Sequence, residues 1–136
     1  MKKFFFSFFL IITFDIKSHE FNPAHLVIDE INNIDHIYEA TWMYPFKNIG
    51  NRAKVNFPKG CDVVSDKISY QGKYINEKFF LNCASSLKGL NIEIVNLSVL
   101  TDALVTINFN DDIFEGLINV QKNILKIPLS SNYYPS

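Results

Sequence analysis

The chain has 136 residues, which is room for one domain, and its 13 basic and 14 acidic side chains give a net charge of −1 at neutral pH. This balance offers no basic face, which argues against nucleic acid and anionic lipid as partners.

The first eighteen residues have the three-part pattern of a secretory signal peptide. Lys2 and Lys3 form a positive start, an apolar run extends from Phe4 to Phe14, and polar character returns up to Ser18. The run is shorter than the roughly 20 apolar residues of a membrane-spanning helix, although an uncleaved anchor is the alternative. Cleavage near Ser18 would remove three lysines and one aspartate, leaving ten basic and thirteen acidic side chains, a net charge of about −3. We therefore expect a periplasmic or extracellular protein with no transmembrane segment in its mature chain.

From residue 24 onward, short β patterns alternate with turn residues. The run 24–31 is β-branched but only loosely alternating, so we expect a strand near the edge of the domain. Residues 32–35 are a turn by composition. Pro45 ends the next strand, because proline has no N–H to donate to a sheet. That strand, 36–44, alternates clearly and places on its predicted core face Tyr38, Ala40, Trp42 and Tyr44.

The middle of the chain predicts three further segments. After a loop at 47–52, alternation over 54–57 indicates a short strand. Residues 61–64 and 68–70 are expected to pair as a hairpin across the polar residues 65–67.

A longer strand follows a turn at Gln71-Gly72. It covers 74–83, and the residues that share its core face are Ile75, Phe79, Leu81 and Cys83. The next segment, 85–89, fits either one helical turn capped by glycine or a loop.

The last third alternates most regularly at 91–95 and 104–109, and residues 110–112 read as a hairpin turn. Residues 114–120 and 124–129 supply the last two strands. Nothing in the sequence has the period of a long amphipathic helix.

About seven to nine short strands with frequent turns predict an all-β fold. We expect a single immunoglobulin-like β-sandwich with one disulfide over residues 19–130, followed by an irregular tail at 131–136. Its predicted core residues are Tyr38, Trp42, Phe57, Phe79, Leu81, Ile92, Ile94, Val105 and Ile107.

The two cysteines, Cys61 and Cys83, predict that disulfide. Two cysteines in an exported chain usually form one bridge, whereas a structural zinc site needs four ligands. Closing the intervening loop should stabilise the fold by roughly 3 kcal/mol.

Catalytic patterns are missing from the sequence. The chain has no Gly-x-Ser-x-Gly elbow, both cysteines are assigned to the bridge, and its five glycines form no phosphate-binding loop. Asp29 and Glu30 are neighbours on a strand and therefore face opposite sides. We expect a protein that is not an enzyme.

A mature N-terminus at His19 is a candidate metal site. Its α-amine and imidazole could chelate Ni²⁺ or Cu²⁺, and Glu20 and His25 are close enough in sequence to add ligands. The alternative is a solvated terminal histidine, with His25 and His36 as ordinary strand residues. No other cofactor is expected.

Several segments together carry a family pattern: His19-Glu20-Phe21-Asn22-Pro23-Ala24-His25-Leu26, Tyr38…Trp42…Pro45, Phe57-Pro58-Lys59-Gly60-Cys61, Cys83…Leu87-Lys88-Gly89-Leu90-Asn91-Ile92 and Leu97…Thr101-Asp102-Ala103-Leu104-Val105. This series resembles the exported N-terminal region of hydrogenase/urease accessory membrane proteins of the HupE/UreJ type. The resemblance implies an extracytoplasmic β-rich domain with a Cys61–Cys83 bridge, which in that family precedes membrane helices associated with nickel or cobalt uptake. The sequence ends at Ser136, before such helices, so we carry over an accessory role beside a separately encoded membrane transport protein and not transport itself.

We therefore expect an exported, non-catalytic binding or accessory domain of a nickel or cobalt uptake system. Two alternatives remain. One is a periplasmic metal carrier that uses His19, Glu20 and His25, and the other is a structural or adhesive surface module.

Overall fold

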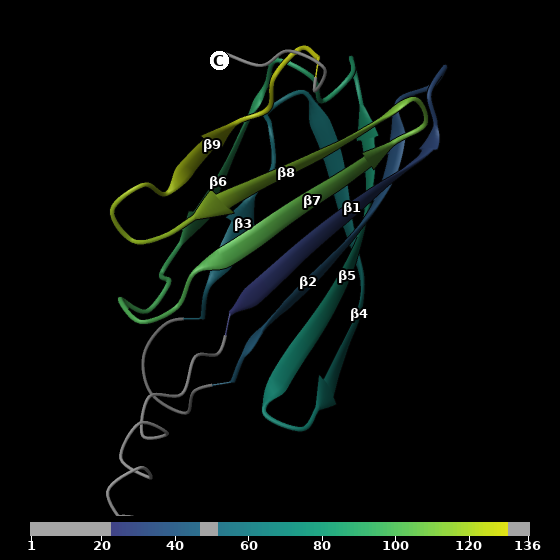
Figure 1. The fold of residues 1–136 in the computed structure, drawn as a ribbon. Coiled ribbons are helices and arrows are strands. Elements are labelled where there is room, and N and C mark those ends of the chain that lie inside the picture. Colours follow the sequence, from purple (N-terminus) through teal and green to yellow (C-terminus); the bar gives the residue numbers. More distant parts are fainter. Residues whose placement is uncertain (1–22, 47–51, 131–136) are drawn as a thin grey trace, which may run out of the picture.

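The computed structural model describes residues 23–46 and 52–130 (Figure 1), and none of these residues is helical. They form nine strands: β1 (Ala24–Asn32), β2 (Ile37–Pro45), β3 (Lys54–Asn56), β4 (Cys61–Gln71), β5 (Tyr74–Cys83), β6 (Asn91–Val95), β7 (Ala103–Phe109), β8 (Asp112–Ile118) and β9 (Ile124–Lys126).

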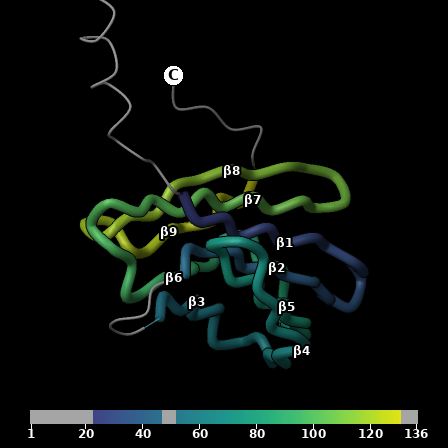
Figure 2. Tube along the Cα trace, turned by 90° about the horizontal axis from the view of Figure 1, so that it is seen from below, coloured from purple at the N-terminus to yellow at the C-terminus, as the bar shows by residue number. Residues whose placement is uncertain are grey.

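The strands make two sheets that pack face to face, which confirms the predicted all-β sandwich. The larger sheet has six strands in the order β4-β5-β2-β1-β7-β8, and the smaller has three in the order β3-β6-β9. All neighbouring strands are antiparallel except β1 and β7, which run parallel. Figure 2 shows the smaller sheet lying along one side of the larger, with β9 near β8 and β3 on the side of β4 and β5.

The core lies between the two sheets and follows from period-two alternation. Along β2, every second residue from Tyr38 to Tyr44 is buried and the residues between them are half-buried. Phe57 and Phe79 are half-buried and pack against the core from its margin. The other residues of the predicted core are fully buried: Tyr38, Trp42, Leu81, Ile92, Ile94, Val105 and Ile107.

The predicted edge position of the first strand is wrong. β1 lies in the middle of the six-stranded sheet, between β2 on one side and β7 on the other. Neighbouring strands shield its outer face, so Val27 and His25 are half-buried there. A strand that is partly buried on both faces needs no strict alternation, which explains its irregular pattern.

The predicted hairpin across residues 65–67 is also wrong. Residues 61–71 form the single strand β4, which pairs with β5 along its whole length. Asp66 is an extra residue between the paired Ser65 and Lys67, so the polar segment is a β-bulge and not a turn. The predicted turn at Gln71-Gly72 is present, with Gly72 at φ +61°, where glycine is favoured.

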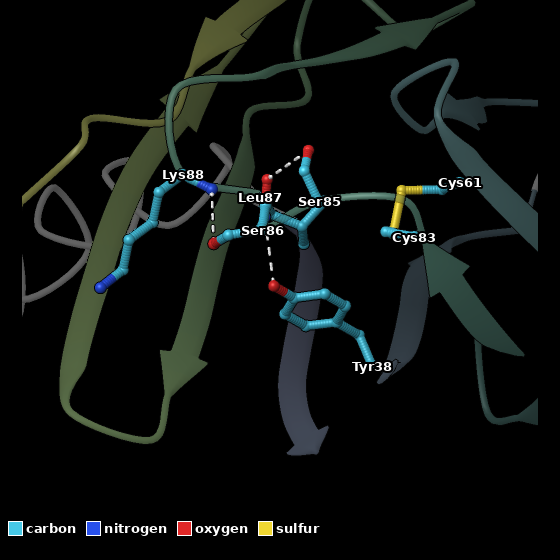
Figure 3. Close-up of a disulfide and its surroundings, with 7 residues drawn as sticks. All are labelled: Tyr38, Cys61, Cys83, Ser85, Ser86, Leu87 and Lys88. Carbon is cyan, nitrogen blue, oxygen red and sulfur yellow. Dashed lines mark hydrogen bonds between the residues drawn. A yellow bond between two sulfur atoms is a disulfide. The ribbon is translucent and has the colours of Figure 1, made fainter. Parts of the chain in front are cut away.

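The predicted disulfide is present. Cys61 and Cys83 are direct partners across β4 and β5, with 3.9 Å between their Cα atoms (Figure 3). The bridge therefore joins neighbouring strands of one sheet at the end of the β4–β5 hairpin. Beyond it, residues 85–89 form a loop, the second of the two expected alternatives.

Hydrogen bonds attach this loop to the core at two points, and at its end the Gly89 N–H donates to the carbonyl of the buried Ile127 over 2.7 Å. The Leu87 N–H donates to the Tyr38 hydroxyl over 3.1 Å, and both residues have no exposed surface. Figure 3 shows the Tyr38 side chain pointing its hydroxyl at the loop, close to the disulfide. Tyr38 therefore connects β2 to a segment that lacks sheet partners of its own.

Several sequence predictions lie outside the described residues: the signal peptide at 1–18, His19 and Glu20, most of the loop at 47–52, and the tail at 131–136. Within residues 23–46 and 52–130, no helix has the length and apolar character needed to cross a bilayer.

Candidate functional site

The candidate site is a groove that exists because the two sheets differ in width. The three-stranded sheet covers only part of the six-stranded sheet, and β3 is its last strand on the side of β4 and β5. An open groove of about 640 Å³ lies there, between the edge of β3 that has no partner strand among residues 23–46 and 52–130 and the inner face of β4 and β5. This volume falls within the range of ligand-binding pockets.

The floor of the groove is apolar. Phe57, just after β3, meets Phe79 of β5 edge to face, with 5.5 Å between ring centroids. Val63 of β4 extends this surface and is 42% exposed. Phe79 and Val63 point inward by strand alternation, and among the described residues no strand of the smaller sheet lies beyond β3 to cover them, so part of this apolar surface stays open to solvent.

A polar cluster closes one end of the groove. The Tyr44 hydroxyl donates to a carboxylate oxygen of Glu77 over 3.1 Å, and the Arg52 guanidinium also interacts with this hydroxyl. Burial raises the pKa of Tyr44, the hydrogen bond from Arg52 opposes that shift, and the charge of Glu77 adds to it. The hydrogen bond to Tyr44 raises the pKa of Arg52. Tyr44 is therefore a neutral donor at physiological pH and holds Glu77 in place.

The charge of the groove is positive at its rim. Arg52 and Lys54 are both exposed, and Glu77 is the only acidic residue among the described residues that line the groove. The charge of Glu77 offsets that of the nearby Arg52, so the positive charge of the rim comes chiefly from Lys54. The rim can therefore attract an anionic group while the Phe57–Phe79 floor accepts an apolar one.

The described residues that line the groove supply contacts for binding. They include no serine, cysteine or histidine that could act as a nucleophile or as its base. The remaining polar lining residues are amides, Asn56 and Asn96, and Asn56 donates to Glu93 over 3.1 Å. The arrangement offers charged, hydrogen-bonding and apolar contacts to a ligand.

The candidate metal ligands are not brought together in the described part of the chain. His25 lies on the outer face of β1, opposite Met43 of β2 and Leu104 of β7. Neither of these side chains supplies the nitrogen or oxygen ligand that Ni²⁺ or Cu²⁺ prefers. Among residues 23–46 and 52–130, no three histidine, cysteine or acidic side chains gather closely enough to hold a metal ion. His36 lies in the turn before β2, with φ +56°, and not in a strand.

Sequence reasoning missed the groove and its polar cluster. It identified Phe57, Phe79 and Tyr44 as core-facing residues but assigned no role to Arg52, Lys54, Val63 or Glu77. One signal in the sequence could have pointed to the groove. The strand predicted around Lys54 and Phe57 is very short, and short strands are often edge strands, beside which a surface can stay uncovered.

The fold and the groove define the class of this protein: a disulfide-bridged β-sandwich with an open groove beside β3, the last strand of the smaller sheet. Comparison of the sequence with models of known protein families and with curated proteins found no match.

Proposed function

We propose that this chain is an exported, non-catalytic β-sandwich that acts by binding, as an accessory domain of a membrane system that takes up nickel or cobalt. The observation that carries the binding role is the open groove beside β3, with its apolar floor and exposed cations. Ligand sites in proteins are typically concave and lined by apolar and aromatic side chains with a few polar groups, as this groove is.

Two further observations support the proposed export and the proposed link to metal uptake. The Cys61–Cys83 disulfide is typical of proteins that work in an oxidising compartment, as the periplasm or the cell exterior is. The series of segments from His19 to Val105 that resembles the HupE/UreJ-type region supports a partner in metal uptake.

The test is metal uptake by cells that lack this protein. We expect the uptake of radioactive nickel or cobalt to fall in such cells and to recover when the wild-type chain is supplied. A Lys54→Glu variant, altered at the exposed rim of the groove, should fold and be exported but restore little uptake. A matched variant at the far edge of the smaller sheet, Lys126→Glu, should restore uptake fully.

Unchanged uptake in cells without the protein would refute the accessory role. Calorimetric titration of the purified protein with Ni²⁺, Co²⁺ and Cu²⁺ distinguishes the accessory domain from the alternative of a metal carrier. Tight metal binding that disappears in His25→Ala would favour the carrier over the accessory domain.

A further inference from the structure

We infer that the groove receives an extended segment of a partner protein, which adds a strand to the free edge of β3 and carries alternating acidic and apolar residues. This inference rests on the binding role proposed above and names the kind of partner. It follows from three features of the groove: an open backbone edge, an apolar floor and a cationic rim.

The backbone of β3 is oriented for strand addition. The Ile94 N–H donates to the Asn123 carbonyl over 3.0 Å, so the backbone of Ile94 faces β9 and not β3. Val55 lies directly opposite Ile94 in the β3–β6 pair. Because the backbone groups of Ile94 point at β9, Val55 and Ile94 form a non-hydrogen-bonded pair of the antiparallel ladder. The N–H and C=O of Val55 therefore point away from β6, into the groove.

A second contact shows the same orientation two residues earlier. The Ala53 carbonyl, which lies on the same side as the backbone groups of Val55, accepts the indole N–H of Trp42 over 3.3 Å. The larger sheet thus anchors one end of this edge through Trp42. The edge at Val55 has no strand beside it among the described residues, because β3 is the last strand of its sheet.

The six-stranded sheet provides a floor for the added strand. A new strand would lie about 4.8 Å from β3, and facing sheets pack about 10 Å apart. Its inward side chains would then contact Val63 and the Phe57–Phe79 pair, and the smaller sheet would gain the width that it lacks over β4 and β5. Apolar residues are therefore required at alternate positions of the partner segment.

The rim selects the charge of the remaining positions. Val55 is buried, so its neighbour Lys54 projects from the opposite, solvent-facing side of β3. Outward residues of an added strand would lie beside the exposed Lys54, whereas Arg52, two residues earlier, interacts with the Tyr44 hydroxyl at the end of the groove. Acidic residues at these outward positions form favourable cross-strand pairs, whereas basic residues would repel.

β3 is the better edge for this addition than β4. A bulge between Ser65 and Lys67 interrupts the pairing geometry of β4, and bulges protect edge strands from further pairing. The edge of β3 has no such interruption in its register with β6.

The test uses two synthetic peptides with blocked ends, Asp-Val-Glu-Val-Asp and Lys-Val-Lys-Val-Lys, and the full disulfide-bonded protein. Nuclear magnetic resonance of backbone amides reports the binding site and its strength. We expect the acidic peptide to shift the Val55 amide signal and slow its hydrogen exchange, and the basic peptide to bind several-fold more weakly. Lys54→Glu should reverse this preference, whereas Lys126→Glu, with the same charge change on β9, should preserve it.

A third peptide separates strand addition from charge attraction alone. Methylating the backbone nitrogens of the acidic peptide keeps its charges but removes the hydrogen bonds of an added strand, so we expect binding to be lost. Equal binding of the methylated peptide, equal binding of the basic peptide, or no effect at Val55 would each overturn the inference. So would a concentration-dependent dimer that protects the Val55 amide without peptide, because a second copy would then be the occupant. None of these results bears on metal uptake by whole cells, which tests the accessory role separately.

Discussion

Replacing Tyr38 with phenylalanine should destabilise the fold by removing one oxygen atom. The Tyr38 hydroxyl accepts the N–H of Leu87, and both residues are fully buried. Tyr38→Phe keeps the ring and its edge-to-face contact with Phe109, whose centroid lies 6.3 Å away, but leaves the Leu87 N–H in the core without its acceptor. A buried polar group left without a partner costs about 1–3 kcal/mol. For a domain of this size, each 1 kcal/mol lowers the melting temperature by roughly 4 °C.

The assay is urea unfolding of the oxidised protein, followed by the fluorescence of its single tryptophan, Trp42. Tyr70→Phe is the matched control, because it removes the same atom from a residue that is 63% exposed and keeps the ring contact with Phe46. We expect the control to unfold as the wild type does and the Leu87 amide of Tyr38→Phe to exchange faster. A Tyr38→Phe protein within about 0.5 kcal/mol of wild type, which is the range of ordinary surface substitutions, would refute the reasoning.

Three further predictions concern the disulfide, the core and the polar cluster. Replacing Cys61 and Cys83 together with alanine should lower the free energy of unfolding by about 3 kcal/mol, because the unfolded chain gains freedom, and urea unfolding measures it. Trp42→Ala should cost about 3–5 kcal/mol, because the fully buried ring stacks on Tyr44 with 5.3 Å between centroids. Burial raises the pKa of Tyr44 above its ordinary value of 10.0, so the stability that this residue contributes is complete below pH 10.0 and is lost as pH rises through the folded-state pKa. Tyr44→Phe should therefore flatten the alkaline decline in melting temperature.

Each of these predictions has a contrary result. Free thiols in the purified wild-type protein, detected by mass spectrometry, would remove the basis of the first. An unchanged melting temperature in Trp42→Ala would mean that the aromatic face of β2 does not support the core. An alkaline decline of equal steepness in Tyr44→Phe and wild type would mean that other groups cause it.

Local patterns in the sequence were enough for most strands and for the disulfide. Alternation over 36–44 identifies the buried face of β2 because a strand turns successive side chains to opposite sides, whatever its neighbours are. The pairing of Cys61 with Cys83 followed from the expectation that two cysteines in an exported chain form one bridge.

Strand order, in contrast, depends on contacts between residues far apart in the sequence. The central position of β1 results from its parallel pairing with β7, about eighty residues further along the chain, as in the partners Ile28 and Ile107. The polar residues 65–67 have the composition of a turn, but continuous pairing with β5 keeps them in a strand through a bulge. Tertiary pairing outweighs such local preferences because a strand's stability comes mainly from its neighbours.

The sequence by itself determined an all-β, disulfide-bridged domain and the inward faces of its strands, because both depend on short-range periodicity and on cysteine count. Only the tertiary structure decided that the two sheets differ in width, which leaves Phe57 and Phe79 half-exposed and brings Arg52 and Glu77 to one groove. The physical reason is that a groove is surface left uncovered when elements distant in sequence pack together, so no single segment of the chain encodes it.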